Sequence, residues 1–137
     1  PRTWQGGCIT GAGELKAYAG ALRVAYTLQT VCEGTKGTIH EGLVAAAHAS
    51  CLSMALAAGL EKAGYPATSI TTKASCTMSF VDGAPRITKM QLEVRGKVPG
   101  IDQAAFAEAA EDAKNGCPVS NALKGNVPFE LSATLDN

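Results

Sequence analysis

The clearest hydrophobic pattern in the chain begins near residue 38, where apolar residues start to recur every three or four positions. This spacing predicts one continuous helix to about Ala63, with its apolar stripe buried. Thr38 and Glu41 have the spacing of a capping box at its start, and Gly64 and Pro66 end it. The members of the predicted stripe are Leu43, Ala46, Ala47, Ser50, Cys51, Met54, Ala57 and Ala58.

Two long segments with strand-like patterns follow, at 69–81 and 86–98. The dipeptide Asp82-Gly83 between them is a strong signal for a tight hairpin turn. Apolar and polar residues alternate in the second segment, which predicts a strand with one buried face. Only Ile87 departs from this alternation, because it falls on the polar face.

The remaining elements are shorter. Asp102 is a good N-cap for a helix through Asn115, with Gly116 in a left-handed C-terminal conformation. Pro118 suits the first position of a short helical turn that follows Cys117. Strands are expected at Trp4–Thr10, Glu14–Ala19, Val24–Cys32 and Val127–Leu135. The order of strands, helix, hairpin, helix and strand predicts an α+β fold, and we expect one domain over residues 1–137.

Composition and charge argue against two classes of protein, those that bind nucleic acids and those that span a membrane. The chain has 137 residues, with 12 Lys and Arg against 12 Asp and Glu, so its formal net charge is zero. Nucleic-acid binding is not expected, since it needs clustered positive charge. The apolar run 43–60 reaches the lower length limit of a membrane span, but His48 and two serines interrupt it. We therefore expect a buried helix in a protein without a membrane span, and a second copy of the chain to help cover it.

The cysteines indicate the compartment. Cys8, Cys32, Cys51, Cys76 and Cys117 are widely spaced, form no CxxC pair and are odd in number. This pattern does not match a secreted disulfide framework, so a reducing cytoplasm is expected. The chain begins at Pro1 without an initiator Met, so the native N-terminus is expected to differ from this one, and nothing there resembles a signal peptide.

Cys51 is the main candidate for chemistry, because it lies in the predicted helix with His48 one turn earlier. A reactive thiolate needs donors or positive charge around it and a second thiol or a base nearby. Cys117 is a candidate second thiol, because it precedes a predicted helix start.

Three alternatives stay open from the residues alone. A buried cysteine is often only a small hydrophobic core residue. His48, Cys51 and His40 also form a loose metal-ligand set, although zinc sites have tighter spacing. A Cys–His hydrolase would need an oxyanion hole that the sequence does not announce. Cys8, Cys32 and Cys76 fall in strand patterns and are expected to be packing residues.

The sequence around both cysteines resembles the OsmC/Ohr family of osmotically inducible and organic-hydroperoxide-resistance proteins. The helix segment contains Gly37-Thr38, Glu41 and the run LVAAAHASCLSMAL at residues 43–56, which includes Cys51. The second segment begins with KVPGID at residue 97 and continues with AKNGCPVSNAL around Cys117. Trp4, Gly6 and the C-terminal strand fit the same template, so the resemblance covers almost the whole chain. His48 and the VPGID run point to the OsmC branch.

The resemblance implies an OsmC-like fold of antiparallel sheets around a long central helix, in an intertwined homodimer with active sites at the subunit interface. It implies a cysteine-based peroxidase that needs no cofactor. Cys51 matches the peroxidatic cysteine, Cys117 the resolving cysteine and Glu41 the active-site glutamate. The implied partners are an organic hydroperoxide and a dithiol reductant such as a lipoyl group. Leu52, Met54 and Leu56 are expected to line the site and to favour alkyl hydroperoxides.

Two departures from the family pattern affect the expected activity. Val31 occupies the position where the family usually has an arginine that stabilises the peroxidatic thiolate. Arg23 and Lys36 are the candidates to replace it. Ile39-His40 stands where Asn-Pro is usual. The alternative reading is therefore a dimeric binding module for an apolar ligand that keeps the fold without the catalysis.

Overall fold

The computed structural model describes residues 2–5, 8, 10, 12–17, 22–27 and 39–137, which fall into two compact units divided after Gly42. The N-terminal unit holds an antiparallel sheet of β1 (Arg2–Gln5), β2 (Ala12–Ala17) and β3 (Leu22–Thr27), in that order. Each of these strands overlaps a predicted strand and begins two residues before the predicted start. Arg23 pairs with Glu14 across β2 and β3, at 3.0 Å between Nε and Oε2.

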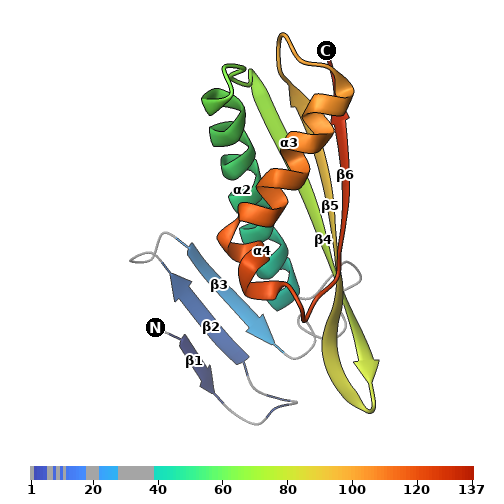
Figure 1. Cartoon of the computed structure of the whole chain (residues 1–137). Helices are drawn as coiled ribbons and strands as arrows, with labels where there is room; N and C mark the ends of the chain where they lie inside the picture. Colours follow the sequence, from blue (N-terminus) through green and yellow to red (C-terminus); the bar gives the residue numbers. More distant parts are fainter. Residues whose placement is uncertain (1, 6–7, 9, 11, 18–21, 28–38) are drawn as a thin grey trace. The chain divides into compact units, whose positions relative to one another are not determined.

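The larger unit runs from Leu43 to Asn137 and packs helices against one face of a three-stranded sheet, as Figure 1 shows. Its strands lie in the order β4-β5-β6. The order of elements agrees with the α+β prediction. The elements are α2 (Ile39–Lys62, which begins in the N-terminal unit), β4 (Ser69–Val81), β5 (Ala84–Lys97), α3 (Gln103–Gly116), α4 (Pro118–Leu123) and β6 (Phe129–Leu135).

The buried face of α2 is not the predicted stripe. The buried residues of α2 also recur every three or four positions, and most of them are large: Glu41, Ala45, His48, Leu52, Leu56 and Leu60. Most of the alanine-rich stripe is exposed, and Met54 is 72% exposed. Burying a leucine removes more apolar area from water than burying an alanine, so the helix turns its leucines inward. The prediction of the helix was right, but that of its buried face was wrong.

The β4–β5 hairpin follows the prediction closely. Asp82 and Gly83 have φ values of 52° and 79°, as a type I′ turn requires. The pairing slips by one residue where Thr77 faces Lys89 but Met78 faces Ile87, so Thr88 is an extra residue in β5. A β-bulge of this kind reverses the alternation beyond it. Ile87 therefore packs against the core, which explains its place outside the simple pattern.

The last strand is the exception to the antiparallel pattern, because β6 pairs with β5 in parallel. Parallel neighbours need a long crossover connection, and α3 with α4 supply it. Asp102 caps α3 as predicted, with its carboxylate accepting from the Ala105 amide at 2.8 Å.

The end of α3 differs from the prediction. Gly116 has helical geometry rather than positive φ, and Cys117 is the residue that leaves the helix, with φ −67° and ψ 128°. Pro118 explains the difference, because a residue that precedes proline is driven out of the helical region. As a result, Cys117 sits at the break between α3 and α4.

One close approach in the core requires a glycine. A Cβ at Gly96 of β5 would lie 2.6 Å from Cε1 of Phe106, whose side chain is fully buried in α3. We expect Gly96→Ala to lower the free energy of unfolding by about 1–3 kcal/mol, because the ring has no room to move. Gly59→Ala is the matched control, since nothing lies within 4 Å of that added Cβ. Denaturant titration of both variants tests this, and equal stabilities would contradict it.

Among the described helices, α2 is long and apolar enough to cross a membrane by length and composition. The central helix of a globular protein meets the same criterion. Here α2 buries Leu52, Leu56 and Leu60 in the same core as Met90 of β5 and Phe106 of α3. This packing buries one face of α2, whereas only 28% of its apolar window is buried in the single chain, so the predicted burial is met only in part.

Candidate functional site

The two predicted redox cysteines, 66 positions apart in sequence, meet in the larger unit. The Sγ atoms of Cys51 in α2 and Cys117 at the α3–α4 break lie 2.9 Å apart, and no disulfide joins them. Cys117 is fully buried, whereas Cys51 is partly exposed. The pair therefore has one thiol that a reagent can reach and a second thiol behind it.

The pKa values of the two thiols are shifted in opposite directions. The hydrogen bond with Cys117 raises the pKa of Cys51, and the Val119 amide offsets only part of this effect. Burial pushes the pKa of Cys117 upward, but hydrogen bonds from Cys51, Ser120 and Val119 outweigh it and lower that pKa overall. In the reduced pair, the two sulfurs are therefore joined by a direct hydrogen bond.

His48 lies on the core side of α2 and is fully buried. Its Nε2 is 2.7 Å from Oγ of Ser120 in α4, and its ring contacts the edge of Phe129 at 5.0 Å between centroids. Burial lowers the pKa of His48, which favours the neutral ring. The sequence predicts that His48 lies on the same helix face as Cys51. In the structure, its side-chain hydrogen bond is made with Ser120, three residues after Cys117.

Ser120 is the site residue that sequence reasoning missed. It occurs in the quoted motif around Cys117, but nothing assigned it a role. The sequence signal that could have indicated Ser120 is its spacing from Cys117. Residues three positions apart lie on the same face of a helix, so Ser120 is expected near the cysteine that precedes α4. Only the packing of α4 against α2 brings its hydroxyl to His48.

Glu41 is buried in the first turn of α2, and its Oε2 has no hydrogen-bond partner among the described residues. A buried carboxylate oxygen of this kind needs a donor. The role of Glu41 at the site stays a prediction.

Other expectations divide into three groups. Cys8 lies in an exposed turn rather than in a packed strand, because β1 already ends at Gln5. Cys76 packs against the core from β4, as predicted. Val31, Cys32, Lys36 and Thr38 lie outside the described residues, so the missing arginine, its replacement by Lys36 and the capping box are not described.

The remaining basic candidate, Arg23, is ion-paired with Glu14 on the exposed surface of the N-terminal unit. Its guanidinium is thus already engaged, and a role in stabilising Cys51 stays untested. The proposed metal set of His40, His48 and Cys51 does not come together, and the described part of the chain has no cluster of three or more potential ligands.

The expected apolar lining of the site is only partly correct. Leu52 and Leu56 are buried in the core, with 0% and 1% exposure, so they cannot line an access route. Met54 is the exposed member of the three, one turn beyond Cys51 on α2. On α2, the accessible residues near Cys51 are thus Met54 and the small residues of the exposed stripe.

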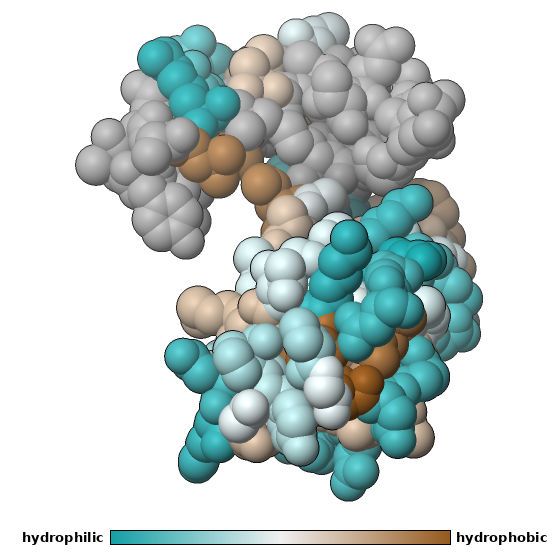
Figure 2. Space-filling model, turned by 90° about the horizontal axis from the view of Figure 1, so that it is seen from above, coloured by the Kyte–Doolittle hydropathy of each residue, from teal (hydrophilic) through white to brown (hydrophobic). Residues whose placement is uncertain are grey.

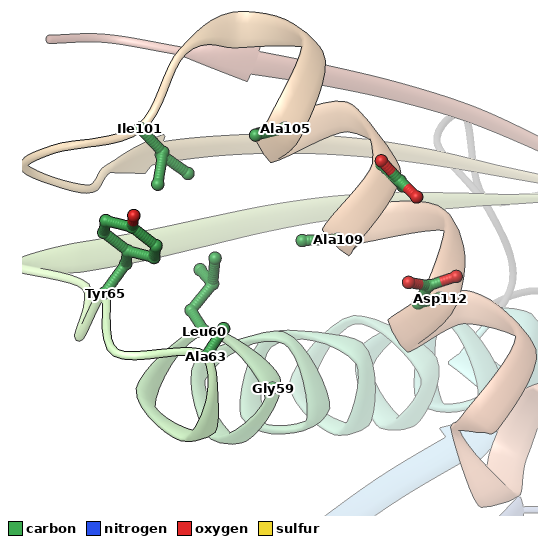
Figure 3. Close-up of a pocket in the computed structure, with 9 residues that line it drawn as sticks. Gly59, Leu60, Ala63, Tyr65, Ile101, Ala105, Ala109 and Asp112 are labelled. Atoms are coloured by element: carbon green, nitrogen blue, oxygen red, sulfur yellow. The ribbon is translucent and has the colours of Figure 1, made fainter.

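A groove of about 270 Å³ lies elsewhere, between the C-terminal end of α2 and α3. Figure 3 shows Leu60, Tyr65 and Ile101 pointing into it, with Asp112 on the side of α3. In Figure 2, viewed from above, hydrophobic side chains show through between polar ones on the described surface. No residue of the cysteine pair lines this groove, so it is separate from the candidate site.

Comparisons with known proteins agree on one family. The family model for OsmC-like protein matches residues 34–132. Peroxiredoxin OsmC of Escherichia coli K12 is 41% identical over 128 residues, covering 93% of this chain and 90% of the relative. An organic hydroperoxide resistance protein of Xanthomonas axonopodis pv. citri is 32% identical over 101 residues, covering 72% of this chain and 68% of the relative.

Solved structures agree on the fold. An organic hydroperoxide resistance protein from Elizabethkingia anophelis has a TM-score of 0.79 at 23% identity, covering 98% of this chain and 94% of that one. OhrB of Bacillus subtilis has a TM-score of 0.75 at 24% identity, covering 97% and 96%. At these identities the likeness concerns the fold.

Proposed function

This chain belongs to the OsmC family, and from that premise we propose that it reduces organic hydroperoxides with Cys51 and Cys117 as its redox pair. The peroxidase activity itself follows from the 41% identity, over most of the chain, to peroxiredoxin OsmC of Escherichia coli K12. The observation that carries the proposed mechanism is the pair of sulfurs 2.9 Å apart, one partly exposed and one buried.

Cys51 is the peroxidatic residue in this mechanism because a substrate can reach it. Its thiolate attacks one oxygen of the hydroperoxide, the O–O bond breaks, and the alkoxide leaves and takes up a proton to become an alcohol. Cys51 is oxidised to a sulfenic acid. The attack needs the negative charge on Cys51, which a basic residue beside it would stabilise. Arg23 and Lys36 are the candidates for that residue, and Glu41 is the candidate to orient it.

Cys117 then resolves the sulfenic acid. Its sulfur forms the S–S bond as the S–O bond breaks, and the departing hydroxide takes a proton to become water. A small dithiol, for which a lipoyl group is the proposed physiological source, restores both thiols by exchange and is itself oxidised to a disulfide. We place this cycle in the cytoplasm, where the reducing environment returns the disulfide to thiols.

The exposed stripe of α2 supports a homodimer. Met54 and the neighbouring alanines form an apolar face beside Cys51, and such faces on a stable protein mark contact surfaces. A second copy is the proposed cover. It would also provide an apolar surround for the alkyl chain of the substrate.

Disulfide mapping over time tests the proposal. Reduced protein receives one equivalent of cumene hydroperoxide and is then alkylated and digested for peptide mass spectrometry. We expect a Cys51–Cys117 disulfide to form before any other, with hydrogen peroxide reacting more slowly. Oxidation scattered across all five cysteines would contradict the mechanism and favour the binding module suggested by Val31.

A further inference from the structure

The further inference concerns what the reduced pair of Cys51 and Cys117 can bind, and it does not depend on the peroxidase cycle. We propose that the two thiols form a chelating site for a monosubstituted trivalent arsenical, a metalloid centre that carries one organic group and bonds to two sulfurs. The 2.9 Å between the Sγ atoms, with one thiol partly exposed and the other fully buried, carries this proposal.

The number of ligands at the site limits what it can hold. Structural zinc takes four protein ligands and catalytic zinc takes three. The described part of the chain brings together no group of three or more His, Cys, Asp and Glu side chains. A centre bound at this pair must therefore be satisfied by two sulfurs. A monosubstituted arsenical meets this condition, because its organic group already occupies one of its three bonds.

The distance between the sulfurs favours a bent centre over a linear one. Two sulfurs at about 2.3 Å from a shared centre, the length of a zinc–thiolate bond, lie about 3.3 Å apart at a right angle and about 4.6 Å apart when linear. Trivalent arsenic keeps a lone pair, so its three bonds form a pyramid with angles near a right angle. From 2.9 Å, the pair opens by about 0.4 Å for this centre but by about 1.7 Å for a linear one such as Cu(I).

The surroundings permit the small movement and oppose the large one. Cys117 is 0% exposed, and its backbone amide donates to the carbonyl of Ala113 at 2.9 Å. The helix that carries the other sulfur, α2, is anchored in the core by Leu52 and Leu56. Both backbone segments are thus fixed, whereas the partly exposed side chain of Cys51 has room to rotate by a few tenths of an ångström.

The charge of the complex also suits a buried sulfur. Two thiolates on a monosubstituted arsenic(III) centre give a neutral product, because that centre with its organic group carries two positive charges. The same thiolates on a singly charged ion such as Cu(I) keep one net negative charge. A charge beside the fully buried Cys117 is costly to desolvate. Geometry and charge therefore favour the same ligand.

The binding step exchanges ligands on arsenic without any change in oxidation state, and phenylarsine oxide is the probe. The Cys51 sulfur, which a reagent can reach, bonds to arsenic first, and Cys117 then closes the chelate. Two As–S bonds replace the bonding between arsenic and oxygen, and the oxygen leaves as one water molecule with the two thiol protons. Arsenic stays trivalent and keeps its phenyl group, which lies on the accessible side of Cys51.

Titration of the fully reduced protein with phenylarsine oxide tests the inference. Intact mass gives the arsenic stoichiometry, and alkylation with N-ethylmaleimide followed by peptide mapping shows which cysteines are protected. We expect one arsenic per chain, with Cys51 and Cys117 protected together. In excess glutathione, the apparent Kd should be at least about 100-fold lower than for Cys51→Ser or Cys117→Ser, because the second bond forms within one molecule.

Two controls separate the chelate from binding to any cysteine. Cys76→Ser should bind like the unaltered protein, since the inference gives this residue of β4 no role. A dimethylated arsenical can form only one As–S bond, so it should bind the unaltered protein no more tightly than phenylarsine oxide binds Cys51→Ser. This second arm needs no change at a buried residue. Equal affinity in the unaltered protein and Cys51→Ser, or protection of another pair of cysteines, would overturn the inference.

The peroxidase cycle and the chelate fail in distinguishable ways. If the unaltered protein forms the Cys51–Cys117 disulfide with cumene hydroperoxide but holds phenylarsine oxide no more tightly than Cys51→Ser, only this inference fails. If it chelates arsenic through both thiols but never forms that disulfide, the proposed function fails and the inference stands. Protein oxidised to the disulfide beforehand should take up no arsenic at the pair, and uptake there would count against the chelate.

Discussion

Cys51→Ser should reduce the rate of hydroperoxide consumption by a factor on the order of 10³ or more, because it removes the nucleophile of the first step. The serine hydroxyl is far less ionised than a thiol and cannot pass through a sulfenic acid. Steady-state turnover with cumene hydroperoxide and a dithiol measures this loss. Cys117→Ser should instead allow one turnover and leave a sulfenic acid that dimedone traps, since only the resolving sulfur is missing.

Cys76→Ser is the matched control for these variants. Cys76 is a half-buried cysteine of β4 that packs against the core, and the mechanism gives it no role. Its replacement should leave turnover within about twofold of the unaltered protein, as for a substitution outside the reacting groups. Retained activity in Cys51→Ser, or an equal loss in Cys76→Ser, would contradict the assignment of Cys51.

Met54→Asp should weaken the proposed dimer by roughly 100-fold or more in its dissociation constant, because each interface would desolvate unpaired carboxylates. Met54 is 72% exposed in the single chain and is the largest exposed side chain of the apolar α2 stripe. Sedimentation of the reduced protein over a range of concentrations measures this change. Turnover should fall with the dimer, since the second copy is expected to complete the apolar surround of the substrate beside Cys51.

Ser132→Asp adds the same charge to the polar outer edge of β6 and serves as the control. It should leave the sedimentation profile unchanged. A monomeric unaltered protein would contradict the dimer proposal directly. A Met54→Asp variant that stays dimeric would show that another surface joins the copies.

The local elements could be predicted because their signals are local. The Asp82-Gly83 turn, the Asp102 cap and the proline start at Pro118 each depend on backbone preferences of a few adjacent residues. The motifs around Cys51 and Cys117 are specific enough to identify the family, which the family model confirms over residues 34–132.

The sequence misled where two local preferences competed. Gly116 suits a left-handed helix end, but Pro118 moved the break to Cys117. Apolar and polar residues alternate correctly on each side of Thr88, but the β-bulge that reverses the two faces at this residue can be seen only in the pairing of β4 with β5. The alanine stripe of α2 was regular, yet the leucines next to it bury more area.

The sequence by itself determined the family and the order of elements and indicated the two candidate cysteines, because this information resides in motifs and in the periodicity of neighbouring residues. The tertiary structure alone decided that the two sulfurs lie 2.9 Å apart, that Cys117 is the buried one, and that Ser120 reaches His48 across 72 positions. Distances of this kind depend on how α4 packs against α2, and the pattern within either helix carries no information about that packing.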